Sequence, residues 1–193
     1  MRIISGTAAN LILKTPEGFG VRPTPDLVRQ AIFNSLGERV VDARVLELFG
    51  GTGALSLECL SRGAAQATCI EMSRKHARFI EKNFEATKIA PPSRFQLRLQ
   101  DVFDAIPQLA TTGATFDLIL ADPPFGDKNV GRRSTSMSQQ LLDHELLPSL
   151  LAPGGLFVLG HTRRDTLTLT PAWTEKKEMK HGDSMVRFLV RSV

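Results

Sequence analysis

Apolar and polar positions change their period along the chain in a regular way. Between about residue 45 and residue 160, short apolar runs are followed by segments in which apolar residues recur every three or four positions. The short runs are typical of buried strands, and the longer period is typical of helices that pack by one face. We predict strands over 45–49, 67–70, 95–99, 116–121 and 156–160. We predict helices over 54–62, from residue 73 onward, in a short segment that ends at about residue 109, and over about 138–151.

The last part of the chain breaks this alternation. Residues 173–180 and 184–191 both have strand character, and His181-Gly182-Asp183 joins them as a turn. Such a pair forms an antiparallel hairpin, whereas strands separated by helices pair in parallel. The whole pattern predicts an α/β fold: a Rossmann-like, doubly wound, mostly parallel seven-stranded sheet with a C-terminal antiparallel hairpin.

The first forty residues precede this alternation and have a different pattern. The runs 2–5 and 10–14 predict a small hairpin. A helix should follow, with Thr24 as its N-cap, Pro25 in its first turn and Gly37 as its stop. We therefore expect an N-terminal extension of hairpin and helix over 1–40, and a main domain over 41–193.

Composition limits the class of protein. The chain has 193 residues, of which 42% are hydrophobic and 23% charged, as in globular domains. No apolar run is long enough to span a membrane, and the first ten residues contain no apolar segment of a secretory signal. The two cysteines form no disulfide framework, and the four histidines lack metal-ligand spacing. We expect a cytoplasmic monomer without a metal ion.

The charge of the chain favours a polyanionic partner. The formal net charge is +4 and the isoelectric point is about 9.4. Basic residues gather in the first thirty positions, where Arg22 and Arg29 lie, and again at Lys128, Arg132 and Arg133. A solvated surface is the alternative interpretation of each cluster.

Polar groups that could bind a ligand follow each of the first four predicted strands of the main domain. They are Glu47 with the glycine turn 50–53, then Glu71, Asp101 and Asp122. In open α/β sheets, ligands bind at the carboxyl ends of strands. A dinucleotide fingerprint would need a third glycine where Ser56 stands, and no lysine follows the turn as a phosphate-binding loop requires.

Glu71 and Asp101 have the spacing expected for binding a nucleoside. A carboxylate at Glu71 can accept hydrogen bonds from both ribose hydroxyls, and this suits NAD and S-adenosylmethionine equally. Asp101 can accept from an adenine amine while Val102 packs against the ring. Helix capping or simple surface exposure is the alternative for both acids.

The tetrad Asp122-Pro123-Pro124-Phe125 is the most informative motif. Two prolines stiffen the loop and remove two N–H donors, which leaves carbonyl and carboxylate oxygens as acceptors. A flat base can stack on Phe125. Acceptors at Asp122 and Pro123 can bind both hydrogens of a ring amine and direct its lone pair at a methyl donor. We predict methyl transfer from a sulfonium donor to a planar amine.

These motifs resemble those of a known family. The run 45–55 is similar to the first motif of class I S-adenosylmethionine methyltransferases, and Asp122 to Phe125 resembles their amino-methyltransferase motif. The opening Arg2 to Gly6, the segment Arg22-Pro23-Thr24 and the run 61–64 resemble the RsmD family of bacterial enzymes. That family methylates a guanine N2 in small-subunit ribosomal RNA.

The resemblance implies a fuller set of site residues. It implies S-adenosylmethionine as cofactor, with S-adenosylhomocysteine as product, and 16S ribosomal RNA or a small-subunit particle as partner. Catalysis is expected at Asp122, Pro123, Pro124 and Phe125. Cofactor contacts are expected at Glu47, Phe49, Gly51, Gly53, Glu71, Met72, Asp101, Val102 and Asp122. RNA contacts are expected at Arg22, Thr24, Arg29, Lys128, Arg132 and Arg133.

Two other functions remain open at this point. The tetrad also suits methylation of an adenine N6 or of a protein glutamine amide, since each is a planar amine. An inactive RNA-binding assembly factor is the alternative from another class, although such a factor needs none of the four acids at the strand ends. An NAD-dependent oxidoreductase has no use for the tetrad.

Overall fold

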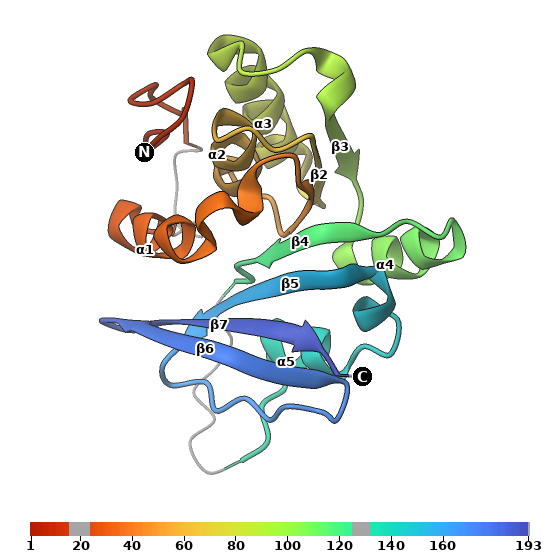
Figure 1. The fold of residues 1–193 in the computed structure, drawn as a ribbon. Coiled ribbons are helices and arrows are strands. Elements are labelled where there is room, and N and C mark those ends of the chain that lie inside the picture. The colour runs from red at the N-terminus through yellow and green to blue at the C-terminus, as the bar shows by residue number, and fades with distance from the viewer. Residues whose placement is uncertain (16–23, 125–131, 193) are drawn as a thin grey trace. The chain divides into compact units, whose positions relative to one another are not determined.

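The computed structural model describes residues 1–15, 24–124 and 132–192 (Figure 1). The chain forms two compact units, Met1–Ala105 and Ile106–Val193. The boundary falls inside helix α4 (Val102–Thr111). The expected division at residue 40 stays a prediction.

The first unit contains a parallel sheet of three strands. They are β1 (Arg44–Leu48), β2 (Gln66–Glu71) and β3 (Phe95–Leu99), in the spatial order β3-β2-β1. Leu48 pairs with Ile70, and Glu71 pairs with Leu99. Because the strands are parallel, their carboxyl ends and the polar residues that follow them lie at one edge.

Two helices connect these strands, as the apolar period predicts. All residues of α2 (Ala54–Ser61) are buried. Helix α3 (Arg74–Thr87) buries one face and exposes the other, and the short 3-10 helix η2 (Pro92–Arg94) leads into β3. The Ser73 hydroxyl caps α3 by accepting from the backbone N–H of His76 at 3.3 Å. The helix that the sequence predicts from residue 73 onward is thus confirmed.

Helix α1 (Asp26–Leu36) begins one residue later than its sequence suggests. Pro25 is the N-cap and no side chain caps the helix, so the prediction of Thr24 as N-cap is wrong. Pro25 has an extended ψ of 146°, which places it before the first helical turn. Gly37 ends α1 with a φ of 54°, as expected, and the 3-10 helix η1 (Gly37–Val40) follows.

The first fourteen residues form a compact segment with a single antiparallel bridge, between Arg2 and Ile12. The predicted hairpin is therefore present as a bridge and turn rather than as two strands. The segment is attached to α2 by backbone donors. The N–H groups of Ile4 and Ser5 donate to the Glu58 carboxylate at 2.7 and 3.0 Å.

Glu58 is the centre of this attachment. Its side chain is fully buried, and it also accepts from Nε of Arg62 at 2.7 Å. The Arg29 guanidinium of α1 lies 3.9 Å away. One carboxylate thus joins the N-terminal segment, α1 and α2.

The second unit combines parallel and antiparallel pairing. Its strands are β4 (Phe116–Ala121), β5 (Leu151–Thr162), β6 (Trp173–His181) and β7 (Ser184–Arg191), in the order β4-β5-β7-β6. Strands β4 and β5 are parallel, whereas β7 is antiparallel to both β5 and β6 (Figure 1). The predicted terminal hairpin is confirmed.

The predicted helix over 138–151 is wrong in its length. Helix α5 spans only Met137–Asp143, and a 3-10 helix η3 (Leu147–Leu150) follows. Strand β5 then begins at Leu151, five residues earlier than predicted. The register shifts between Phe116 and Leu118 of β4, so 153–155 lie inside a strand that is irregular at this point. Pro153, Gly154 and Gly155 are accommodated at this irregularity in the pairing of β4 with β5.

Trp173 packs in the core of the second unit. Its ring lies 5.1 Å from that of Phe157, between centroids, and only 4% of the residue is exposed. Its Nε1 donates to the carbonyl oxygen of Leu142 at 3.1 Å. The indole is therefore part of the core and not a binding platform.

These elements confirm the predicted fold class. The described residues contain seven strands, of which β1 to β5 pair in parallel within their units and the last two form an antiparallel hairpin. Within 1–15, 24–124 and 132–192, no helix is long and apolar enough to cross a membrane.

We expect Glu58→Ala to lower the free energy of unfolding by about 3 kcal/mol, because it leaves two partly buried N–H groups without their acceptor and removes a buried negative charge beside the Arg29 guanidinium. Urea denaturation followed by circular dichroism measures the change. Glu85→Ala on the exposed face of α3 is the control, and it should change stability by less than about 0.5 kcal/mol. Equal stability of the two variants would contradict the role of Glu58.

Candidate functional site

The turn between β1 and α2 has an unusual backbone. Gly51 and Gly53 have φ values of +58° and +72°, and Phe49 has +61°. A bulky residue with positive φ is strained, and such strain gathers at functional sites. The Phe49 ring meets that of Phe103 edge to face, with centroids 6.2 Å apart. The predicted glycine turn is present in the first unit.

Gly53 also allows α3 to approach the turn. A Cβ added to Gly53 would lie 2.9 Å from Cγ2 of Ile80, which is too close for a side chain at this position. Gly53 therefore brings the start of α2 against α3 without a clash.

Glu47 lies beneath the turn rather than in reach of a ligand at the surface. Only 2% of the residue is exposed. Its carboxylate accepts from the backbone N–H groups of Leu55 and Ser56 at 3.3 and 2.9 Å. Burial raises its pKa to about 7, although the hydrogen bonds from Ser56 act in the opposite direction. Glu47 was expected to contact the cofactor. In the structure its role is instead to hold the first turn of α2.

Glu71 closes the turn from the other side. Oε2 accepts from the N–H of Gly51 and Oε1 from the N–H of Ser73, both at 2.7 Å. His76 Nδ1 lies 3.6 Å from Oε1. Each carboxylate oxygen can accept a second hydrogen bond, so both can bind a hydroxyl without releasing the backbone.

Asn83 was missed by the sequence analysis and fixes the same turn. This buried side chain of α3 donates to the carbonyl oxygens of Thr52 at 3.2 Å and Lys14 at 2.9 Å. Its Oδ1 accepts from the N–H of Lys14 at 2.8 Å. The sequence signal for Asn83 is that its amide lies among the apolar positions of an amphipathic helix. A buried amide needs hydrogen-bond partners, so this position indicates a structural role.

Asp101 caps helix α4, which is the alternative to cofactor binding that its sequence position allows. Its Oδ1 accepts from the N–H of Phe103 at 2.7 Å, in the first turn of α4. The cap uses one oxygen of a half-buried carboxylate, so the two roles are compatible.

The apolar groups at this edge differ from the expectation. Val102 is 4% exposed, which leaves little of it for a ligand ring, whereas Met72 is 65% exposed. Leu99, which the sequence analysis missed, is 49% exposed and pairs with Glu71 across β2 and β3. The available signal was an apolar residue at the end of a strand, opposite the acid that is expected to bind the ribose.

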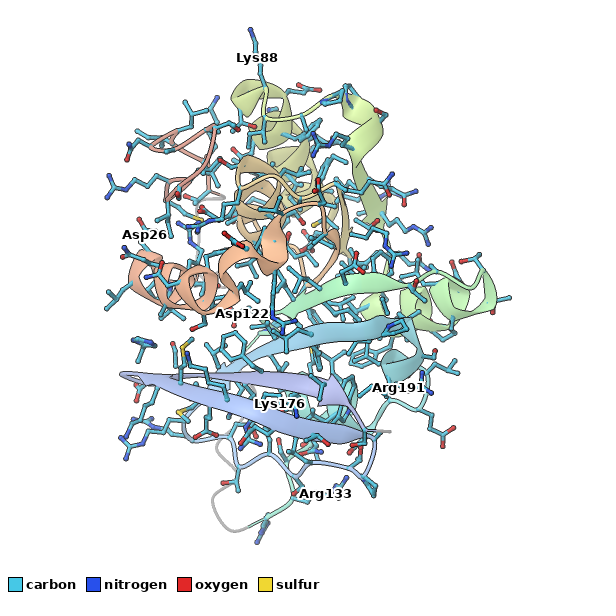
Figure 2. The ribbon with its side chains drawn as sticks, in the orientation of Figure 1. Asp26, Lys88, Asp122, Arg133, Lys176 and Arg191 are labelled. Atoms are coloured by element: carbon cyan, nitrogen blue, oxygen red, sulfur yellow. The ribbon has the colours of Figure 1, made fainter. Side chains whose placement is uncertain are left out.

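The second unit positions the tetrad at the end of β4. Asp122 follows Ala121 directly, Pro123 is buried and Pro124 is exposed (Figure 2). A Cβ added to Gly160 of β5 would lie 2.5 Å from Oδ1 of Asp122, so the carboxylate occupies space that glycine leaves open. Phe125 lies outside the described residues.

The structure corrects one of the expected RNA contacts. Arg29 has no exposed surface, and its Nη2 donates to Asp26 at 2.8 Å and to the carbonyl oxygen of Arg2 at 2.5 Å. A phosphate at the surface cannot reach this guanidinium, so its role is structural. The burial follows from partners on the N-terminal segment and α2, which a local sequence pattern does not contain.

The other expected RNA contacts have different outcomes. Arg22 and Lys128 lie outside the described residues, and Thr24 is half-buried before α1. Arg132 and Arg133 are exposed in the second unit, where Arg133 pairs with Asp143 at 2.7 Å. No group of three or more metal-ligating side chains occurs in the described part of the chain.

We expect the free energy of unfolding of Glu47→Gln, measured relative to that of the unchanged protein, to increase as the pH rises. With a pKa of 4.5 in the unfolded chain and about 7 in the folded protein, Glu47 takes up a proton on folding between these values. The unchanged protein therefore loses stability as pH rises through this window, by at most on the order of 3 kcal/mol, whereas glutamine does not titrate.

Urea denaturation of both proteins at several values between pH 4.5 and 8 measures this difference. Glu85→Gln is the matched control, because it removes an exposed carboxyl on α3. A stability difference for Glu47→Gln that stays constant with pH would contradict the prediction.

Comparison with known proteins gives the family of the chain. A family model described as conserved hypothetical protein 95 matches residues 1–190. Ribosomal RNA small subunit methyltransferase D of Escherichia coli K12 is 40% identical over 125 residues, which are 65% of this chain and 60% of that protein. The alignment thus spans about three fifths of that relative's length.

Two further similarities extend over more of the chain. The methyltransferase D of Haemophilus influenzae is 28% identical over 183 residues, covering 94% of this chain and 89% of the relative. The solved structure of yhhF from Escherichia coli has a TM-score of 0.81 and 30% identity, with 100% of this chain and 98% of that chain covered. The chain therefore belongs to the conserved hypothetical protein 95 family, which is the RsmD family that its motifs resemble.

Proposed function

We propose that this protein transfers a methyl group from S-adenosylmethionine to the N2 amine of a guanine in small-subunit ribosomal RNA. The observation that carries the proposal is the Asp-Pro-Pro motif after β4 in a chain whose family model spans residues 1–190. The similar proteins from Escherichia coli and Haemophilus influenzae are named as small-subunit ribosomal RNA methyltransferases.

The first unit supplies the groups that suit the methyl donor. Glu71 has a second acceptor position on each oxygen for the ribose hydroxyls. Met72 and Leu99 are exposed apolar groups beside it, which suits the adenine ring. Glu47 supports this site from below, since it holds the first turn of α2.

The tetrad suits the acceptor base. The Asp122 carboxylate and the Pro123 carbonyl can accept both hydrogens of the guanine amine, which holds the nitrogen lone pair along the line of attack. The nitrogen forms its bond to the methyl carbon as the carbon–sulfur bond breaks, and the electron pair of that bond stays on sulfur. One amine proton then leaves to solvent. Because the sulfonium is already activated, positioning supplies most of the acceleration.

Asp122→Ala should lower kcat for methyl transfer on the order of 100-fold or more, since it removes an acceptor that positions and polarises the amine. Asp122→Asn keeps a carbonyl oxygen and should lose less. Transfer of a labelled methyl group to small-subunit RNA measures both variants, with the affinity for S-adenosylhomocysteine as control. Full activity of the alanine variant would exclude this role.

The same assay identifies the product. Nuclease digestion of labelled RNA should release N2-methylguanosine, and assays on naked RNA and on small-subunit particles compare the two substrates. N6-methyladenosine or labelled protein would instead support the alternative acceptors, and absence of transfer to any of them would reject the proposal.

Glu71→Ala should weaken binding of S-adenosylhomocysteine between about 10-fold and 100-fold, the range for hydrogen bonds to a charged group. Isothermal titration calorimetry measures the affinity. Glu81→Ala, on the exposed part of α3, is the control and should bind as the unchanged protein does. Unaltered affinity in Glu71→Ala would mean that another group binds the ribose.

A further inference from the structure

Helix α3 carries a cationic hollow that the cofactor site does not use. The hollow has a volume of about 360 Å³, and in the described part of the chain it is lined by Arg74, Lys75, Arg78, Phe79 and Lys82. The four basic residues are exposed and Phe79 is half-buried. We call this set the α3 patch.

The α3 patch has a regular geometry. Arg74, Arg78 and Lys82 are spaced by four residues, so they form a row along one side of the helix with a step of about 6 Å. Lys75 and Phe79 are four residues apart in the neighbouring row. Cations at this spacing can contact successive charges on one extended partner.

The row formed by Arg74, Arg78 and Lys82 has no anionic partner in the part of the chain that the structure describes. The two acids of α3, Glu81 and Glu85, do not line the hollow. The row is therefore available to an external anion.

The stability of α3 gives no reason for these cations. Arg74 and Lys75 lie in the first helical turn, where the helix dipole disfavours positive charge, and that turn contains no acidic residue. The helix is stabilised instead by the Ser73 cap and by its buried face. A sequence that breaks a local rule in this way is expected where function requires it.

We propose that the α3 patch is a second contact surface for the RNA substrate, where it binds the phosphates of a single-stranded segment. This inference rests on the proposed function. Arginine binds phosphate oxygens in pairs, and lysine adds a point charge. An aromatic side chain among cations is typical of surfaces that bind single strands, because an unpaired base can stack on it. An acidic protein would use the charges but not Phe79.

The test reverses two charges on the exposed row. In Arg78→Glu with Lys82→Glu, the affinity for a small-subunit RNA transcript should fall at least about tenfold at low salt. The slope of log affinity against log salt should become shallower by about 0.7 for each lost phosphate contact. Fluorescence anisotropy with the labelled transcript measures both quantities.

A matched control separates specific contact from a change in net charge. Lys176→Glu with Lys180→Glu makes the same change on exposed positions of β6 (Figure 2 labels Lys176) and should leave affinity and slope close to those of the unchanged protein. Equal losses in both double variants would overturn the proposal. So would an unaltered slope in the α3 variant, or Phe79→Ala binding a short single-stranded RNA as tightly as the unchanged protein.

Failure of the α3 patch proposal can be distinguished from failure of the proposed function. Binding of S-adenosylhomocysteine should be the same in the α3 variant and in the unchanged protein, which also shows that the variant is folded. If the unchanged protein methylates RNA and the α3 variant binds it equally well, the patch proposal fails alone. If the unchanged protein methylates no RNA, the proposed function fails, and the binding assay still decides whether the patch contacts RNA.

Discussion

Two buried carboxylates hold the glycine turn between β1 and α2. Glu47 accepts from the first turn of α2, and Glu71 accepts from Gly51 and Ser73. Without these acceptors, the backbone N–H groups of a strained turn would be buried without partners. The bonds of Glu47 hold the start of α2, and those of Glu71 join the end of strand β2 and the residue before helix α3 to the turn.

The hydrogen bonds of Glu71 have a consequence for the cofactor binding that we propose. The carboxylate is already oriented by two backbone donors before any ligand arrives, so its side chain loses little further freedom on binding. The same bonds connect the proposed ribose-binding carboxylate to the shape of the turn. A change at Ser73, which is not among the expected cofactor contacts, would therefore alter ligand affinity through the orientation of Glu71.

Much of the fold and part of the site could be predicted from the sequence, because those features have local causes. The Ser73 cap, the buried strands and the terminal hairpin follow from patterns within a few residues. The burial of Arg29 and the attachment of Ile4 to Glu58 could not be predicted, since their partners are distant in sequence. Asp122 was found from its prolines, whereas the contribution of Gly160 requires the pairing of β4 with β5.

The two cysteines, Cys59 and Cys69, have a practical consequence. Both are fully buried, and burial raises the pKa of each thiol well above its ordinary value, so neither forms a reactive thiolate. The chain has no other cysteine. A single cysteine introduced on the surface would thus be the preferred site for a maleimide dye or a spin label. Distances from chosen positions to a labelled RNA could then be measured without first removing the native cysteines.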